Sequence, residues 1–557
     1  MKSIQFKSLD RKLFGTKVKS QNVKNSERWL GYFLGPALVA CMNAICAQSY
    51  LNQFYTDVLK LSPIAGGLFL ALMPLLSKIV DAVTNVAMGR IIDHTNSKQG
   101  KARPWLLLSG PLMAISSILL FAVPDSSLPM TIIWVTVSYN LYFCISYTMY
   151  NISNTLLVPL STRNSKQRDT LAMASSMGIS MIPGVLVSML FPMVLLPFLG
   201  VDRGRWGLVM TIIGLLAIPA TLIQYKFSRE RVTEDSPAST QAEDAVSFGQ
   251  QIKGCLSSKY WIVIMGIVIV YQLFNNFQVT STIYYCNWVL GTYNDGTTMT
   301  ILNAIGQAPL GLGILILWPP VKRFGKRNVM VAGCAMGIVG GVICALNARN
   351  MGMVLIGLVL RSFGTLPITY TLTAMVADAL DHVEWLNKFR CDGFSSSVYS
   401  IIMTVTTGIS MGVFNLLLGS LGYVAPLADG SWVPQNAAVQ NFFIAGMFVV
   451  PAVGLFLIGF LLGFFQVEKE LPQMQADILQ RHKDAAAARG EVYVSPEEKA
   501  AMEQVELDRV AEENRVKELK ARCAKKGLSF DAEEAKYQQK LAERKAREAA
   551  KAKKDRK

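Results

Sequence analysis

Charged residues are scarce in most of this 557-residue chain. They make up 17% of all residues, against roughly a quarter in an average soluble protein. The first 28 residues hold 8 Lys/Arg and 2 Asp/Glu, and residues 467–557 hold 22 and 19, which leaves 24 and 17 for the long stretch between them. A weakly charged body between two charged ends excludes a soluble globule, a fibrous repeat and a disordered chain, and it indicates a polytopic membrane protein.

Several kinds of chemistry lack the residues that they need. The nine cysteines include no C-x-x-C pair, and the three histidines lie far apart in the sequence, so neither a disulfide scaffold nor a metal site is expected. The sequence has no P-loop for ATP, no selectivity-filter motif and no convincing Ser/His/Asp or paired-carboxylate pattern. We therefore predict that the protein is not an enzyme, uses no cofactor and binds no nucleic acid. Secondary transport remains as the best interpretation.

Apolar runs of membrane length recur twelve times and predict an all-α fold. The predicted spans cover about 29–52, 63–92, 104–123, 130–159, 170–199, 206–227, 259–290, 298–320, 328–347, 351–381, 393–424 and 437–466. Short loops on one side carry thirteen Lys/Arg and those on the other carry four. The positive-inside rule then predicts that both termini are cytoplasmic. The protein is expected to be a multi-pass protein of the cell (inner) membrane.

A polar stretch divides the twelve spans into six and six, which is typical of a transporter built from two related halves. The predicted parts are a basic cytoplasmic N-terminal arm (1–28), a six-helix half (29–227), a cytoplasmic central loop (228–258), a second six-helix half (259–466) and a charged, partly helical cytoplasmic tail (467–557). Within the tail, Pro496 opens a helix that Gly527 breaks, and a second helix begins near Asp531. The tail is either a solvated extension or a docking element.

Charges inside the spans are the first candidate site, because an ion at mid-membrane is costly and is retained mainly for function. Lys78 and Asp81 lie three residues apart, on one helix face, where they can pair. Thr84 and Asn85 follow one turn later and offer oxygen atoms suited to a hard cation. These four residues are the predicted cation-binding and coupling group; the alternative is a structural ion pair between helices.

Span 10 contains a second set of charges, which we assign to gating. Arg361 lies within the span, either as a functional charge or as an arginine that reaches carbonyl groups or the lipid interface. Acidic and basic residues gather where the span ends and are predicted to form a cytoplasmic charge network. They are Asp378, Asp381, Glu384, Arg390 and Asp392.

Spans 4 and 7 are too polar to face lipid and must line the interior or a water-filled cavity. Amides and hydroxyls beside tyrosine rings suit a polyhydroxylated solute, because they bind its hydroxyls while the rings cover its C–H faces. The predicted substrate-binding residues are Tyr147, Thr148, Asn151, Asn154 and Thr155 in span 4, with Tyr271 and Asn275 in span 7.

Five runs of sequence resemble the glycoside–pentoside–hexuronide:cation symporters. They are FYTDVLKLSP, KIVDAVTNVAMGRIIDHTNSKQGKARPW, YTMYNISNTLLVPLSTRNSKQRDTL, VDRGRWG and MVADALDHVEWLNKFRCDGFSSSVYS, and the resemblance covers about residues 28–470 in order. The resemblance implies a major facilitator fold of twelve helices, alternating access, and uptake of a glycoside-like solute with Na⁺ or H⁺ as the coupling ion. The arm and the tail lie outside it.

The site residues of that family are only partly present. Its span 2 motif carries two acids in the pattern Asp-Ala-x-Asn-Asp-Pro; here the first is Asp81, and Asn85 stands in place of the second. The resemblance thus implies that any coupling depends on Asp81. In span 4, Thr148 matches the family in type, whereas Asn151 replaces an acid of its galactoside clamp. Because this galactoside clamp, the one found in the family's melibiose permease, is not kept here, a solute other than melibiose is expected.

The sequence thus predicts a monomeric, Na⁺- or H⁺-coupled importer of a small sugar or glycoside that works within the lipid bilayer. Two alternatives remain open. The first is an uncoupled facilitator or exchanger of a polar solute, and the second is a membrane-embedded regulatory protein whose tail binds a partner.

Overall fold

The computed structural model describes residues 4–5, 15–47, 49–62, 67–232, 247–427, 430–488, 490, 493 and 496–554. Its described part is almost entirely helical. Two short strands, β1 (Ile4–Gln5) and β2 (Thr95–Asn96), pair in parallel, with Ile4 opposite Thr95. Part of the predicted central loop, residues 233–246, lies outside the described residues.

Helices occupy each of the first six predicted spans. In chain order they are η3 (Glu27–Leu34), α1 (Gly35–Ala47), α2 (Ser49–Gln53) and η4 (Phe54–Val58); α3 (Leu68–Asp93); α4 (Arg103–Phe121); α5 (Leu128–Asn140), η6 (Leu141–Tyr147) and α6 (Thr148–Ser161); α7 (Ser165–Val185), η7 (Leu186–Leu195) and α8 (Leu196–Leu199); and α9 (Arg203–Leu215) with α10 (Ala217–Lys226). The η segments are π-helical turns within longer helices, a feature often found near functional sites.

The second six predicted spans are helical as well. They comprise α13 (Lys259–Tyr285) with η8 (Cys286–Leu290); α14 (Thr297–Phe324); α15 (Lys326–Leu346); α16 (Met351–Asn387); α17 (Asp392–Ser420); and α18 (Ala437–Ile444), η9 (Ala445–Val449) and α19 (Val450–Phe464). A short helix, α12 (Phe248–Ser257), precedes them. Among the described residues, eleven spans are long and apolar enough to cross a membrane, and α14 lies where the remaining span is predicted. The all-α polytopic prediction is confirmed.

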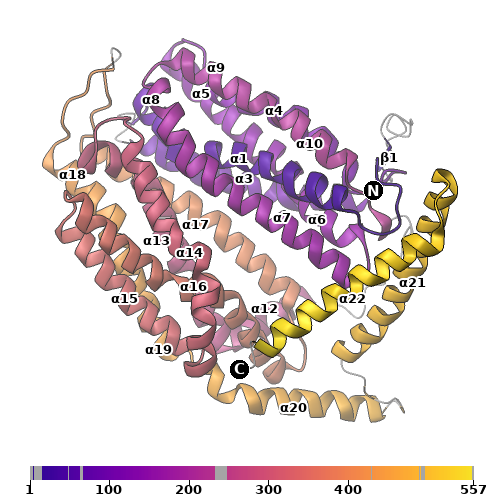
Figure 1. The fold of residues 1–557 in the computed structure, drawn as a ribbon. Helices are drawn as coiled ribbons and strands as arrows, with labels where there is room; N and C mark the ends of the chain where they lie inside the picture. The colour runs from indigo at the N-terminus through magenta and orange to yellow at the C-terminus, as the bar shows by residue number, and fades with distance from the viewer. Residues whose placement is uncertain are drawn as a thin grey trace.

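The two sets of helices pack mainly within themselves and meet along a few elements. In the first set α4 packs on α9 and α10, and in the second α15 packs on α16 and α19 (Figure 1). Contacts between the sets run chiefly through α3 with α17 and through η7 with α14. Figure 1 shows the N-terminal arm and the helices that follow α19 on one side of the bundle, called here the termini side, and α8, α9 and α18 toward the opposite side.

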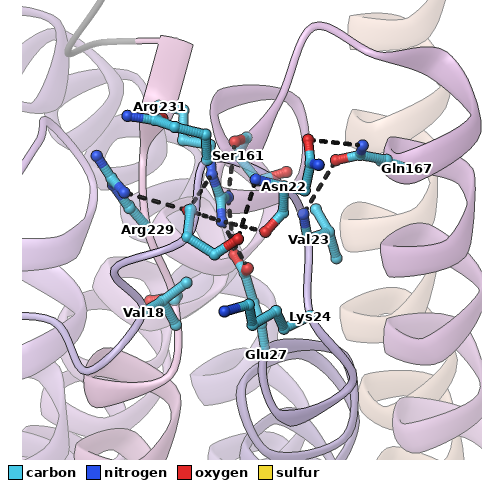
Figure 2. Close-up of polar contacts among 12 residues, drawn as sticks. Val18, Asn22, Val23, Lys24, Glu27, Ser161, Gln167, Arg229 and Arg231 are labelled. Atoms are coloured by element: carbon cyan, nitrogen blue, oxygen red, sulfur yellow. Dashed lines mark hydrogen bonds and ion pairs between the residues drawn. The ribbon is translucent and has the colours of Figure 1, made fainter. Parts of the chain in front are cut away.

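A buried ion pair holds the N-terminal arm to the start of the central loop (Figure 2). Arg231 donates from Nη1 to Glu27 Oε1 at 3.0 Å and from Nη2 to Glu27 Oε2 at 2.8 Å. It also donates to the backbone carbonyls of Ser20, Asn22 and Ser161, which belong to the arm and to the end of α6. Glu27 is fully buried and Arg231 is 5% exposed, so the pair is shielded from solvent. This cluster ties the arm, α6 and residue 231 into one unit.

The neighbouring Glu230 fixes the start of α4. Its carboxylate accepts hydrogen bonds from the backbone N–H groups of Lys101, Ala102 and Arg103, at 2.8–3.0 Å. These donors have no partner within the helix, and a negative charge at a helix N-terminus is favourable. Residues 228–232, which the sequence assigns to the loop, are therefore part of the folded bundle.

The described part of the charged tail forms three helices, one more than the sequence predicts. Helix α20 (Val467–Ala488) was not predicted, whereas α21 (Pro496–Lys526) and α22 (Phe530–Lys554) were. Gly527, with φ of +65°, lies between α21 and α22, and only glycine adopts that conformation without strain. The tail docks on the bundle: α20 packs along α16, and α21 contacts the arm and the α6–α7 loop.

Candidate functional site

The candidate site is a cavity between the two sets of helices, open toward the termini side. Helices α3 and α17 touch near their opposite-side ends, where a Cβ on Gly412 would lie 2.7 Å from the carbonyl oxygen of Ala71. Farther along they separate, and a cavity of about 1040 Å³ extends past Gly89 of α3 and Ser396 of α17. Val86, which lines it, is 61% exposed, so solvent reaches the cavity.

Hydrogen bonds between the two sets close the opposite side, and we call them the opposite-side clasp. The first helix meets α13 and α17 through Asn52, which donates to Tyr284 at 2.9 Å and exchanges two hydrogen bonds with Asn415 at 2.9 and 3.0 Å. Further members of the clasp are the Gln53–Asn294, Asp57–Tyr293, Asp57–Tyr423, Ser188–Asn303 and Met189–Thr300 pairs. A solute in the cavity is thus accessible from one side only.

Asp81 lies at the centre of a hydrogen-bonded cluster in the wall of this cavity. Lys78 Nζ lies 3.5 Å from Asp81 Oδ2, which confirms that the two side chains pair. Asn85 Nδ2 and Thr148 Oγ1 both donate to Asp81 Oδ1, at 2.9 and 3.0 Å. Thr84 instead donates to the backbone carbonyl of Asp81 at 3.0 Å. Asp81 is 9% exposed, and its two oxygen atoms are stabilised by donors from both α3 and α6.

The span 4 residues predicted to bind substrate divide into two groups. Tyr147, Thr148 and Asn151 line the large cavity together with Lys78 and Asp81. Because Thr148 contacts Asp81 and lines the cavity, the predicted ion site and the predicted solute site are continuous.

Asn154 and Thr155 line neither of the cavities described here. Asn154 is 9% exposed and its Oδ1 accepts from Gln224 of α10 at 2.6 Å, so it joins two helices. Thr155 donates to the carbonyl of Asn151 on its own helix.

The span 7 residues line a second, smaller cavity of about 210 Å³. Tyr271 and Asn275 contribute to its wall, with Gln278 on the same helix and Arg361 facing them from α16. Ser188 of η7 also lines it, so both sets of helices contribute to this cavity. Arg361 therefore lies in a polar cavity rather than in the charge network to which the sequence assigns it. Along the straight length of α16 it is roughly 25 Å from Asp378.

The other five gating residues lie together on the termini side, as the sequence predicts. Arg390 Nη1 lies 2.7 Å from Asp381 and 3.1 Å from Glu384, and its Nε lies 2.7 Å from Asp392. Partial burial alone would lower the pKa of the Arg390 guanidinium, but its bonds to the acids raise that pKa above its ordinary value. The Arg390 guanidinium therefore stays charged at any physiological pH.

The network has members that the sequence did not reveal. Asp378 pairs with Lys326, which begins α15. Helix α20 adds His482, 3.3 Å from Glu384, and Gln475, which donates to Asp381. The tail thus takes part in the charge network at the α16–α17 turn.

Asp57 is a buried carboxylate that the sequence reasoning missed. It is 1% exposed and accepts hydrogen bonds from Tyr423 at 2.7 Å and Tyr293 at 2.9 Å. The predicted first span ends at residue 52, whereas the helix continues to Val58, so Asp57 was not among the predicted charges within spans. The signal was present, because Asp57 lies in one of the runs that carry the family resemblance.

Metal ligands are not gathered anywhere in the described part of the chain. Within those residues no group of three or more His, Cys, Asp or Glu side chains is arranged to hold a metal ion. The site is built from one carboxylate, two cations, amides, hydroxyls and tyrosines. Such groups bind and orient a polar solute and can hold or release one proton or one small cation.

A family model described as MFS/sugar transport protein matches residues 31–469. The isoprimeverose transporter of Lactiplantibacillus pentosus is 29% identical over 445 residues, covering 78% of this chain and 88% of the relative. The glucuronide carrier protein homolog of Escherichia coli K12 is 26% identical over 410 residues, covering 71% and 84%.

The fold is also found among solved structures. A bacterial homologue of the human lysosomal transporter Spinster superposes with a TM-score of 0.53, covering 79% of this chain and 97% of that one. The identity between the two is 13%, so this likeness concerns the fold alone.

Proposed function

The chain belongs to the MFS/sugar transport protein family, and on that premise we propose that it imports a sugar or glycoside-like polar solute by cation symport with alternating access. The family match and the relatives confirm the resemblance to the glycoside–pentoside–hexuronide:cation symporters, and the structural likeness supports the major facilitator fold. The protein is a polytopic membrane transporter and not an enzyme.

The observation that carries the proposal is the contact between Asp81 and Thr148. Both residues line the large cavity, and the Thr148 hydroxyl donates to Asp81 Oδ1 at 3.0 Å. When a cation binds Asp81 or a proton neutralises it, that hydrogen bond weakens and the hydroxyl can turn to the solute. Occupancy of the ion site and of the solute site then affect one another, which is what symport requires.

The coupling ion is proposed to act at Asp81 in either of two ways. A proton would neutralise the carboxylate and release Lys78 from its pair. Sodium would need oxygen ligands, for which Asp81, Thr84 and Asn85 are candidates, and it would have to compete with the Lys78 ammonium at 3.5 Å. The Lys78 ammonium competes with either ion for Asp81, and an ion-gradient experiment separates the two.

The solute is proposed to be a polyhydroxylated molecule, as the amide, hydroxyl and tyrosine groups of the cavity suggest. The large cavity presents Asn43, Tyr147 and Asn151 on one wall and Ser396 and Ser400 on the facing wall. The named relatives, a transporter of isoprimeverose and a glucuronide carrier homologue, support a sugar derivative of this kind.

The state of the molecule fits one half of a transport cycle. The cavity opens to the termini side while the opposite-side clasp is closed. If the termini are cytoplasmic, as the loop charges predict, this is the inward-open state in which an importer releases its solute. We propose that the monomer alternates in the lipid bilayer between this state and one in which α3 and α17 close on the termini side.

Uptake into proteoliposomes tests the proposal. Radiolabelled glycosides should accumulate above the external concentration under an inward pH or Na⁺ gradient, and a protonophore or a sodium ionophore should collapse the accumulation. The ion whose gradient drives uptake identifies the coupling ion. If no labelled glycoside enters faster than into protein-free liposomes, the solute class is wrong.

An uncoupled facilitator or exchanger is the second candidate, and Asn85 favours it. Asn85 stands where the family has a second acid, and Asp81 already has Lys78, Asn85 and Thr148 as partners. This candidate predicts that solute counterflow survives while uphill uptake fails under every ion gradient. A regulatory role for the docked tail is the third: deletion of residues 470–557 would leave transport intact under the first proposal and abolish signalling under the third.

A further inference from the structure

Lys78 carries an ammonium group at membrane depth whose hydrogen bonds are incomplete. Its Nζ lies 3.5 Å from Asp81 Oδ2 and 5.6 Å from the centre of the Phe143 ring. An ammonium group has three N–H donors, and within the described part of the chain the Asp81 carboxylate is its only hydrogen-bond acceptor. Because Lys78 lines the large cavity, water can solvate the other donors while the cavity is open. A charged group at this depth is costly once that water is removed.

Helix α17 crosses α3 directly over the stem of Lys78. A Cβ on Gly408 would lie 2.9 Å from Lys78 Cγ and 3.5 Å from the Cα of Leu75. One turn toward the opposite side, Gly412 meets Ala71. The two helices are therefore in contact from Gly412 to Gly408, and the large cavity begins on the termini side of this crossing.

Thr404 lies on the same face of α17 as Gly408, one turn closer to the termini side. It lines the large cavity, and its hydroxyl forms no hydrogen bond with any residue that the structure describes. The hydroxyl of Thr407, which lines the same wall, is occupied: it donates to the Met403 carbonyl and accepts from Asn276. The Thr404 oxygen is therefore a free acceptor beside the crossing.

The register of the crossing places Thr404 opposite the turn of α3 that contains Lys78 and Asp81. The two helices run in opposite directions, and Leu75 lies against Gly408. Four residues farther toward the termini side, about 6 Å along each helix axis, Thr404 therefore faces that turn of α3. When α17 moves toward α3 on the termini side, these two turns meet first, because they are the nearest to the crossing.

We propose that Thr404 is a positioning residue for Lys78 in the half of the cycle in which the termini side is closed: its hydroxyl oxygen accepts a hydrogen bond from the Lys78 ammonium. Closure removes water from the ammonium, and the Thr404 hydroxyl replaces one of the lost partners. The bond joins the two sets of helices next to the predicted ion site. This inference rests on the proposed function, because it names a contact in the closed state of that alternating-access cycle.

Labelling from the opposite side measures the state in question, since alternating access opens one side when the other is closed. Leu302 is 2% exposed and lines the smaller cavity, whose wall also carries the clasp pair Ser188–Asn303. In the full chain with Leu302→Cys, in lipid nanodiscs, the maleimide labelling rate reports the fraction of molecules with the opposite side open. The rate is corrected for the chain's own cysteines. The assay needs no solute, so it does not depend on which glycoside is transported.

Thr404→Val keeps the shape of the side chain and removes the acceptor, so it should slow labelling by at least about fivefold. Thr404→Ser, which keeps the hydroxyl, should label within about twofold of the parent protein. In a Lys78→Met background, Thr404→Val should change the rate by less than about twofold, because the donor is already gone. Thr406→Val is the matched control on the same helix: its hydroxyl donates to the Ile402 and Met403 carbonyls, and its loss should leave the labelling rate unchanged.

Two results would overturn the inference. One is labelling of Thr404→Val as fast as that of the parent protein. The other is an equal slowing by Thr404→Val with and without Lys78, which would make the effect of Thr404 independent of the ammonium. In either case uptake of labelled glycosides would leave the proposed function standing. If Leu302→Cys is never labelled while Ser400→Cys in the large cavity is, the molecule does not alternate, and the proposed function falls together with the inference.

Discussion

Loss of Arg231 should release the N-terminal arm from the bundle. The carboxylate of Glu27 is fully buried, and Arg231→Ala would leave it without its bidentate partner and remove the donor to the Asn22 and Ser161 carbonyls. Breaking a buried pair on one side costs about 3–5 kcal/mol. Since 1.4 kcal/mol is a factor of ten, the population of the released arm should rise by a factor of about 10² to 4 × 10³.

Limited trypsin digestion of the protein in nanodiscs measures that population, because cleavage tracks the open fraction when opening is fast. The site to follow is Lys19, whose carbonyl accepts a hydrogen bond from Arg229 at 3.1 Å. Arg229→Ala is the matched control, since its bonds to the Lys19 and Ser20 carbonyls are exposed or only partly buried and their loss should change the cleavage rate by no more than about fivefold. A cleavage rate in Arg231→Ala within a factor of about three of wild type would refute the reasoning, because it would place the cost below about 1 kcal/mol.

Two further predictions concern the helix interface and the tail. Gly412→Val should favour states in which the opposite side is open, because a Cβ at residue 412 would lie 2.7 Å from Ala71 O and overpacking costs about 1–3 kcal/mol. In those states the cavity is closed on the termini side, so maleimide should label Ser400→Cys, which lies in the cavity, more slowly. An unchanged labelling rate would contradict this. Hydrogen bonds from Lys166, the larger cause, and from Asn164 hold the pKa of Asp508 below its ordinary value. The contribution of Asp508 to the docking of α21 is therefore present at neutral pH and is lost as pH falls through that lowered pKa. Because the Asp508–Lys166 pair is exposed, the docking free energy lost is at most about 1 kcal/mol. The distance distribution between spin labels on α21 and α7 should broaden only below about pH 4, and broadening already at pH 6 would argue against this prediction.

The fold was predictable because its main determinant, the length and spacing of apolar runs, can be recognised in short stretches of the sequence. Apolar runs of membrane length produced helices at all twelve predicted places, and Gly527 separated the two predicted tail helices. Helix α20 was missed because its sequence has no clear start signal. Its position depends on contacts such as Trp385 with Asp477, which join residues 92 apart in the chain.

The candidate site was predictable where it depends on spacing along one helix. Lys78 and Asp81, three residues apart, do pair, and the acids that follow Asp378 do gather around Arg390. Arg361 was grouped with them although 17 residues of helix separate it from Asp378, and helical geometry alone argues against that grouping.

Other parts of the site depend on which helices pack against one another in the folded bundle. That arrangement places Asn154 against Gln224 instead of in a cavity. The amino-acid sequence alone gives no indication of this contact.

The most direct test of the central claim is transport by Asp81→Ala in proteoliposomes, with uphill uptake and counterflow measured on the same preparation. We expect counterflow of the glycoside to persist and accumulation against its gradient to be lost, because Asp81 is the carboxylate through which ion and solute are coupled. Asp93→Asn removes an exposed acid from the same helix and should behave as wild type. Accumulation by Asp81→Ala equal to that of wild type would contradict the account.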